Sequence, residues 1–295
     1  MLTLEWLAEL HAAHSEAYNA EVIDFDIGGR AFHFNQQPAI MGVVNLSADS
    51  WYRESVCLNT AQALRRAETL MAQGADVIDL GAESTLAHAS IIEKDTQWQT
   101  LEPIVETILK KDGIVSLETY HVDLVKRALE SGVQVINLTG HANSQEVYKL
   151  CAHHKAAVII CYVQGFDVRS VDSLKFQADL ISEMLQWFRI EVARACEAGV
   201  ERIFLDPGLG FYYRNMQDGP MRVRYQMQTF LNTFRLRELG WPVCHALPHA
   251  FETFGEEVRT AESFFAVLAL FGKTDLLRTH EVSKIRAVCD TLQQF

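Results

Sequence analysis

The stretch Phe204-Leu205-Asp206-Pro207-Gly208-Leu209-Gly210-Phe211 places one acidic residue between an apolar run and a Pro-Gly breaker. This pattern is typical of a short buried strand that ends in a turn. Asp206 is therefore expected at the carboxyl end of a strand, where α/β barrels carry their functional side chains. A carboxylate there can accept two parallel N–H bonds from a ligand ring. Taken alone, the stretch is equally compatible with a structural Asp206 that caps the turn.

The same unit, an apolar run followed by a polar tip and then a helical pattern, recurs along the chain. The expected strands are Ala39–Asn45, Ala75–Gly81, Gly113–Glu118, Val133–Asn137, Ala157–Val163, Arg202–Asp206, Pro242–Leu247 and Asp275–Thr279. The expected helices include Thr60–Gly74, Val122–Gly132, Glu183–Gly199, one long helix over Met221–Leu239, and the apolar segment Glu262–Phe271. Eight strands alternating with helices predict an α/β protein with a (β/α)8 TIM barrel over residues 38–295.

An additional unit is expected before the barrel, over residues 1–37. Residues 3–19 show helical spacing, and two alternating runs then flank Gly28-Gly29, a signal for a β-hairpin. We expect this helix and hairpin to cover the barrel floor. No linker or low-complexity tract divides the chain further.

Composition limits the partners. Hydrophobic residues make up 49% of the 295 residues, enough for a large core, and the formal net charge is −12. This charge argues against nucleic acid and against an anionic membrane surface. The six cysteines have no metal-like spacing, and no apolar run is long enough to span a membrane. We therefore expect a cytoplasmic protein with reduced thiols.

The polar residues at the strand ends form a set. They are Asn45, Asp79, Glu118, Asn137, Tyr162 with Gln164, Asp206, His245 with His249, and Arg278 with His280. In a barrel such side chains meet at one mouth, where carboxylates and amides face a hydrogen-bonding ring, and Arg with His faces an anion. Each of these residues taken alone is equally compatible with a structural role, but the set favours a binding pocket.

Several segments also resemble the motifs of dihydropteroate synthases. Ile40–Trp51 is similar to their opening IMGxxNxTPDSF, and Gly74–Thr85 to GAxxIDxGGEST. The remaining matches are Ser116–Tyr120 (SVDTY), Val135–Asn137 (IIND), Asp206–Phe211 (DPGIGF) and Arg278–Val282 (RVHDV). The resemblance covers residues 38–285 and implies a pterin-binding barrel, a superfamily that also contains methyltetrahydrofolate-dependent methyltransferases.

The resemblance implies specific roles for the matching residues. Glu118, Asn137, Asp206 and the residue at the family's lysine position, His249, would hold the pterin. Asn45, Arg278 and His280 would act on the pyrophosphate, with Asn45 near an accompanying Mg²⁺. No tightly bound cofactor is expected.

The chain also departs from the family pattern. His249 stands at the family's lysine position, where a neutral imidazole cannot simply replace an ammonium group, and Leu86-Ala87-His88 stands where the family has Arg-Pro-Gly. The family's Pro, Asp and Gly-Lys are replaced by Ala48, Leu138 and Tyr212-Tyr213. The missing groups are mostly those that stabilise leaving phosphate charge, and Arg53 and Arg214 are the candidates to replace them.

Three hypotheses follow. The first is a divergent barrel that binds a pterin or folate-like ligand, with weakened or altered synthase chemistry. The second is a working dihydropteroate synthase with relocated phosphate-binding groups, and the third is a non-catalytic partner or regulatory barrel. The apolar segment Glu262–Phe271 is compatible with a homodimer face or with packing on the barrel. His153-His154 and His245 with His249 suggest a metal, but no carboxylate or cysteine completes a ligand set in the sequence.

Overall fold

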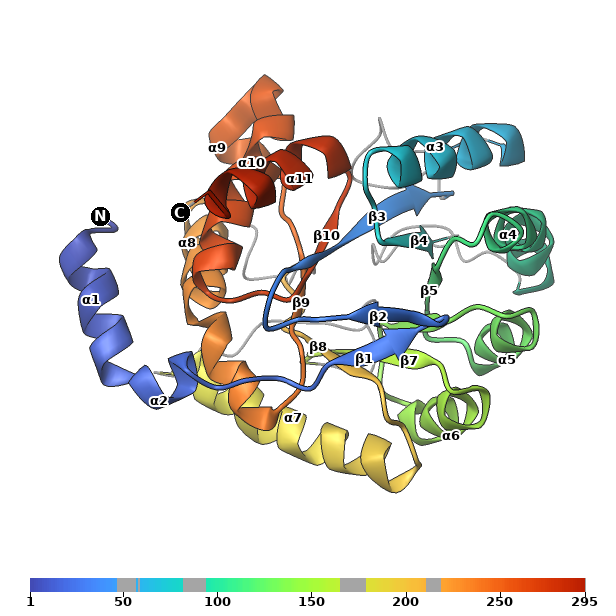
Figure 1. Ribbon diagram of the computed structural model, residues 1–295, viewed down its shortest axis with the longest axis horizontal. Helices are drawn as coiled ribbons and strands as arrows, with labels where there is room; N and C mark the ends of the chain where they lie inside the picture. Colours follow the sequence, from blue (N-terminus) through green and yellow to red (C-terminus); the bar gives the residue numbers. More distant parts are fainter. Residues whose placement is uncertain (47–56, 58, 82–93, 165–178, 211–218, 295) are drawn as a thin grey trace.

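Parallel strands form a nearly closed barrel in the computed structural model, which describes residues 1–46, 57, 59–81, 94–164, 179–210 and 219–294 (Figure 1). The strands are β3 (Ala39–Asn45), β4 (Val77–Gly81), β5 (Val115–Thr119), β6 (Val135–Leu138), β7 (Ala157–Cys161), β8 (Ile203–Asp206), β9 (Cys244–Ala246) and β10 (Leu276–Thr279). They pair in the order β8-β7-β6-β5-β4-β3-β10-β9. A parallel bridge between Leu205 and Val243 links β8 to β9. The predicted (β/α)8 barrel is confirmed.

Helices surround the strands on the outside of the barrel (Figure 1). They are α3 (Thr60–Ala72), α4 (Lys94–Leu109), α5 (Val122–Glu130), α6 (Ser144–His154), α7 (Leu180–Glu197), α8 (Gly219–Asn232), α10 (Val258–Phe271) and α11 (Val282–Leu292), with the short α9 (Phe251–Phe254) and the 3₁₀ turn η4 (Gly255–Glu257). Their caps follow local sequence: the side chains of Asn59 and Asp179 accept from backbone N–H groups three residues later, at the starts of α3 and α7.

The segment expected as one long helix over Met221–Leu239 consists of two parts. Helix α8 ends at Asn232, and the tighter 3₁₀ helix η3 (Thr233–Leu239) follows. Two buried arginines anchor η3 to different elements, since Arg235 binds Asp179 and Arg237 binds Asp275 at 2.6 Å. The helical spacing of apolar residues does not report contacts between residues far apart in the sequence. It therefore predicted one continuous helix.

The N-terminal segment contains α1 (Leu4–Ala13), α2 (Ser15–Tyr18) and a hairpin of β1 (Phe25–Ile27) and β2 (Arg30–Phe32). The helix expected over residues 3–19 is interrupted at His14. Gly28 and Gly29 both have positive φ, 57° and 81°, which the hairpin turn requires and which glycine adopts without a Cβ clash.

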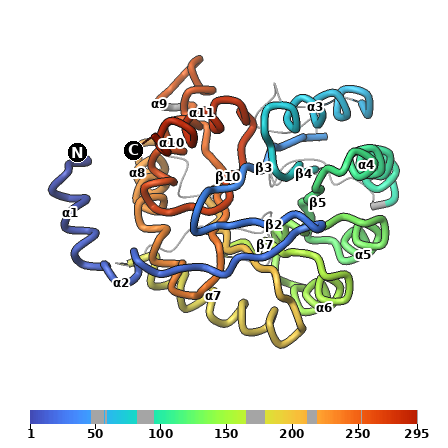
Figure 2. Tube along the Cα trace, in the orientation of Figure 1, coloured from blue at the N-terminus to red at the C-terminus, as the bar shows by residue number. Residues whose placement is uncertain are grey.

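The hairpin crosses one end of the barrel (Figure 2). Its buried side chains join a cluster with residues from the amino ends of the strands: Val22, Ile27, Phe32, Phe34, Ala39, Met41, Val77, Ile114, Val135, Ala157, Ile159, Phe204, Cys244 and Leu276. The ring of Phe34 meets Phe204 edge-on, with centroids 5.3 Å apart. Apolar packing thus fills this end and leaves the carboxyl ends of the strands for polar groups.

The apolar side chains of α10 divide between the two sides of the helix. Phe265 and Leu268 are buried against the barrel, whereas Phe264 and Phe271 are 42% and 50% exposed. No helix in the described residues combines the length and apolarity that a membrane span requires. The six cysteines are free thiols, and five of them are buried.

Candidate binding site at the strand ends

One buried carboxylate, on β4, accepts hydrogen bonds from side chains of three other strands, β5, β6 and β10. Asp79, on β4, is fully buried, and its two oxygens accept hydrogen bonds from Ser116 Oγ at 2.6 Å and from Arg278 Nε at 2.7 Å. The amide nitrogen of Asn137 also donates to Asp79, at 3.3 Å. A second nitrogen of Arg278 donates to Glu118. The structure therefore brings Glu118, Asn137 and Arg278 together around Asp79.

The charges of this group compensate one another. Burial raises the pKa of Glu118, and the neighbouring Arg278 guanidinium opposes that rise. For Arg278 burial favours the neutral form, but Glu118 and Asp79 outweigh it and raise the pKa of the guanidinium above its usual range. The site thus holds a permanent cation between two carboxylates. Charge-assisted hydrogen bonds of this kind are stronger than those between neutral groups and stabilise the buried guanidinium.

Asp206 lies at the end of β8, as the sequence predicted. Its Oδ1 accepts from the backbone N–H of Gly208 at 2.8 Å, and Gly208 has the left-handed φ of 75° that the Pro-Gly turn needs. The side chain is 5% exposed. Burial raises the pKa of Asp206 to about 6, although the Gly208 hydrogen bond opposes the rise. Asp206 is therefore a turn cap and, in its ionised form, an acceptor at the barrel mouth.

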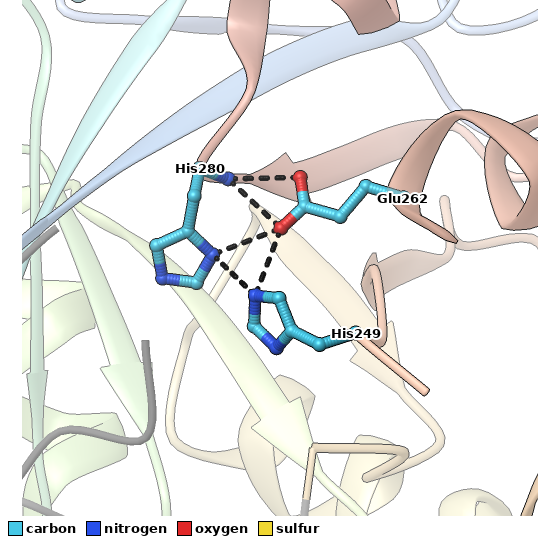
Figure 3. A group of neighbouring side chains, drawn as sticks. All are labelled: His249, Glu262 and His280. Carbon is cyan, nitrogen blue, oxygen red and sulfur yellow. Dashed lines mark hydrogen bonds and ion pairs between the residues drawn. The ribbon is translucent and has the colours of Figure 1, made fainter. Parts of the chain in front are cut away.

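A second group contains two histidines and a glutamate (Figure 3). Oε1 of Glu262, on α10, lies 3.1 Å from His249 Nε2 and 3.0 Å from His280 Nδ1. The same two ring nitrogens are 3.2 Å apart. On its other side, His280 places Nε2 3.2 Å from Asn45 Nδ2. Asn45, His249 and His280 are thus brought together by a glutamate from a barrel helix.

Glu262 is held firmly at this place. Its Oε2 accepts from the Thr279 hydroxyl and from the backbone N–H groups of His280 and Glu281, the latter two at 3.1 and 3.3 Å. Burial on its own raises the pKa of Glu262, but hydrogen bonds from His249 and His280 outweigh it, so the pKa lies below its usual range. Burial lowers the pKa of His280.

Backbone geometry aims His249 into this group. The next residue, Ala250, is buried and has a left-handed conformation with φ 45° and ψ 49°, which is costly for a residue with a Cβ. The turn directs the His249 ring toward His280, with centroids 4.9 Å apart, and onto Phe251. Strain of this kind at a binding site indicates a constraint on the neighbouring side chain.

Sequence reasoning missed Glu262 and named Asp79 only as one polar strand end among several. Asp79 was one of the polar strand ends, and its signal is an acid inside the fully buried run Val77–Gly81. Glu262 sits on the buried face of an apolar helix, where an unpaired carboxylate is unfavourable, and that position was its signal. No carboxylate was expected beside His249 from the sequence, whereas the structure places Glu262 Oε1 3.1 Å from its Nε2.

His245 does not belong to this group. It is fully buried, its Nε2 lies 2.7 Å from Thr233 Oγ1, and burial lowers its pKa to about 3. Leu138 is the last residue of β6 and is buried. The other departures from the family motifs, at 48, 86–88 and 212–213, and the candidate cations Arg53 and Arg214 lie outside the described residues.

Comparisons with known proteins agree with the motifs. The family model described as pterin binding enzyme matches residues 41–247. The dihydropteroate synthase of Synechocystis sp. is 26% identical over 89% of this chain and 92% of its own length. That of Neisseria meningitidis serogroup B is 28% identical over 87% and 91%.

Solved structures share the fold. A Yersinia pestis dihydropteroate synthase with a sulfonamide drug complex superposes with a TM-score of 0.79 at 19% identity, covering 92% of this chain and 98% of that one. A Xanthomonas albilineans dihydropteroate synthase with 4-aminobenzoic acid has a TM-score of 0.77 at 22% identity, with the same coverage.

Proposed function

Because this chain belongs to the pterin binding enzyme family, we propose that it binds a pterin at the carboxyl-terminal mouth of its barrel, with weakened or altered dihydropteroate synthase chemistry. The observation that carries the proposal is the position of Glu118, Asn137 and Asp206 at the ends of β5, β6 and β8.

These three side chains suit the hydrogen-bonding edge of a pterin. Asp206, when ionised, accepts from the 2-amino group and a ring N–H, a pairing that resembles carboxylate–amidine recognition. The amide nitrogen of Asn137 donates a hydrogen bond to Asp79. The side-chain oxygen of Asn137 is therefore the atom that can accept a hydrogen bond from the ligand. Asp206 is largely withdrawn from water, and this strengthens each hydrogen bond that the ring makes.

The transferase reaction demands more than ring binding. The amine of p-aminobenzoate forms a C–N bond to the pterin methylene while the C–O bond to pyrophosphate breaks and its electron pair leaves with the phosphate. Fixed cations stabilise that developing charge, and loss of one such group costs roughly 10²–10³ in rate. Here Arg278 already faces two carboxylates, and His249 faces Glu262 in place of the family's lysine. The proposal of weakened chemistry rests on these two contacts.

A Mg²⁺ ion is part of the proposal only together with pyrophosphate. The Asn45 amide oxygen is a ligand type that Mg²⁺ accepts, and the rest of its shell would come from phosphate oxygens and water. Bound there, Mg²⁺ supplies positive charge to the leaving pyrophosphate.

Calorimetric titration with 6-hydroxymethyl-7,8-dihydropterin pyrophosphate, with and without Mg²⁺, tests the proposal. We expect micromolar binding that Asp206→Asn weakens at least tenfold. Asp26→Asn is the matched control, because the Asp26 side chain lies on β1, is 54% exposed and pairs with Arg202 away from the strand ends that carry Asp206. An unchanged affinity of Asp206→Asn would remove the proposed ring contact.

A second candidate, a working synthase, is favoured by one observation: both curated relatives named above align over about nine-tenths of their length. Turnover of the pyrophosphate with p-aminobenzoate decides between the two candidates. A kcat equal to that of a lysine-containing relative under the same conditions would establish the working synthase and end the proposal of weakened chemistry. Failure to bind any pterin would leave a non-catalytic barrel.

A further inference from the structure

We propose that His249, Glu262 and His280 bind a transition-metal ion of the zinc class through Nε2, Oε1 and Nδ1 respectively (Figure 3). The ligand atoms come from the turn after β9, from α10 and from the end of β10. The site uses only side chains of this chain and does not depend on pterin binding.

The spacing of the three atoms fits one face of a tetrahedron. Their separations are 3.0, 3.1 and 3.2 Å, a nearly equilateral triangle. Zn²⁺ holds nitrogen and carboxylate oxygen at about 2.0–2.2 Å in tetrahedral sites, which places ligand atoms about 3.3–3.6 Å apart. Each side of the triangle therefore needs to open by only a few tenths of an ångström. A fourth position is left for water or for an oxygen of an anionic ligand.

The supporting contacts orient the ligand set. The Thr279 hydroxyl and two backbone N–H groups hold Oε2 of Glu262, so Oε1 is the atom turned toward the histidines. Metal-bound histidines generally donate their second ring N–H to a neighbouring acceptor. For His280 that neighbour is the Asn45 amide, which presents its oxygen to Nε2 after a half-turn about its last side-chain bond.

The chemistry of the set selects the metal. Two of the three ligands are imidazole nitrogens, which suit Zn²⁺, Co²⁺ and other transition metals, whereas Mg²⁺ prefers oxygen. The alternative is a metal-free hydrogen-bonded group in which both imidazoles donate to the same Oε1. In that arrangement two donor nitrogens lie 3.2 Å apart and neither accepts from the other, while a cation uses a lone pair from all three atoms at once.

Metal binding by the full-length protein tests this assignment. The protein is dialysed against a chelator and then titrated with Zn²⁺ in competition with a chromophoric chelator, and separately with Co²⁺ while the visible absorption is recorded. We expect one ion per chain and the strong visible bands of four-coordinate Co²⁺. His249→Ala and Glu262→Gln should each weaken Zn²⁺ binding roughly 100-fold or more, since even supporting residues typically contribute 10–100-fold.

Two control variants test whether Zn²⁺ binds to histidines or thiols outside the proposed site. His153→Ala alters an exposed histidine of the adjacent pair on α6, and Cys196→Ser removes the exposed thiol. Both should bind Zn²⁺ as the parent does. The assignment is overturned if no ion binds, or if His249→Ala binds as tightly as the controls. Circular dichroism establishes that each variant is folded, and if Glu262→Gln is not, the His249→Ala result decides. Pterin titration of the metal-free protein tests the proposed function separately.

Discussion

Arg278 and Asp79 form a buried ion pair that joins the two strands flanking β3 in the barrel, with Nε 2.7 Å from Oδ2. Asp79 is fully buried and Arg278 is 15% exposed in this pair. The guanidinium that the family resemblance assigns to pyrophosphate is therefore also a structural cation. Any anionic ligand at the mouth has to compete with, or add to, the carboxylates of Asp79 and Glu118.

Removing Asp79 should destabilise the fold strongly. Asp79→Ala leaves a buried guanidinium short of its partner, a change that typically costs about 3–5 kcal/mol. The measurement is the free energy of unfolding in urea. Asp95→Ala is the matched control, because Asp95 pairs with Arg127 at 2.6 Å but is 74% exposed, and such pairs contribute about 1 kcal/mol or less. Equal losses in the two variants would contradict a structural role of the buried pair.

Asp206 should make stability depend on pH. Its folded-state pKa of about 6 exceeds the unfolded value near 4, so the folded protein retains a proton that the unfolded chain has released. Stability should therefore fall as pH rises from about 4 to 6, by up to about 3 kcal/mol. The difference in unfolding free energy between the parent and Asp206→Asn, measured at pH 4.5 and 7, reports this contribution. A difference that is constant with pH would refute it. Pterin binding, which needs the carboxylate, should strengthen over the same range.

His245 should have the opposite effect. Its folded pKa of about 3 lies below the unfolded value near 6.5, so the unfolded chain takes up the proton first. Stability should fall as pH drops from 6.5 toward 3, by up to about 5 kcal/mol. His245→Asn, which keeps a polar partner for Thr233, should lose this part of the pH dependence, as followed by urea unfolding. A parallel pH profile in the two proteins would mean that His245 is not buried in the neutral form.

His249→Lys should raise synthase turnover. It restores the cation of the family motif beside Glu262, and one such group contributes roughly 10²–10³-fold to rate. Steady-state assays with the dihydropterin pyrophosphate and p-aminobenzoate measure the change, with His153→Lys on α6 as the control for added charge. No increase over that control would show that the missing lysine does not limit the reaction.

Phe34→Ala should test how far the barrel depends on its hairpin. Phe34 is 4% exposed and contacts Phe204 inside the barrel end, so the variant should lose about 3–5 kcal/mol of unfolding free energy. Phe264→Ala on α10 removes the same side chain from a 42% exposed position and should change stability by about 0.5 kcal/mol or less. A loss for Phe34→Ala as small as the one expected for Phe264→Ala would mean that this packing is dispensable for the barrel.

The pattern of apolar runs and breaker residues predicted the strands because both depend on residues that are neighbours in the sequence. The run Ala39–Asn45 has the same bounds in β3, and the polar ends of the other expected strands lie within two residues of the strand ends described, since an apolar run and a breaker act on neighbouring residues. The motifs likewise indicated the pterin binding family and the strand ends at which Glu118, Asn137 and Asp206 lie.

Pairing between distant elements was decided by tertiary structure. Arg278 reaches Asp79 across 199 positions because closure of the barrel makes β10 and β4 the two neighbours of β3. Glu262 meets His280 because α10 packs beside the end of β10, and the left-handed Ala250 turns His249 toward both. The spacing of apolar residues indicates which face of a helix or strand is buried. It does not indicate which charged side chain of another element lies against that face. Local sequence pattern was therefore enough to predict the barrel and the polar residues at its mouth, whereas the pairing of each cation with its carboxylate depends on how distant elements pack.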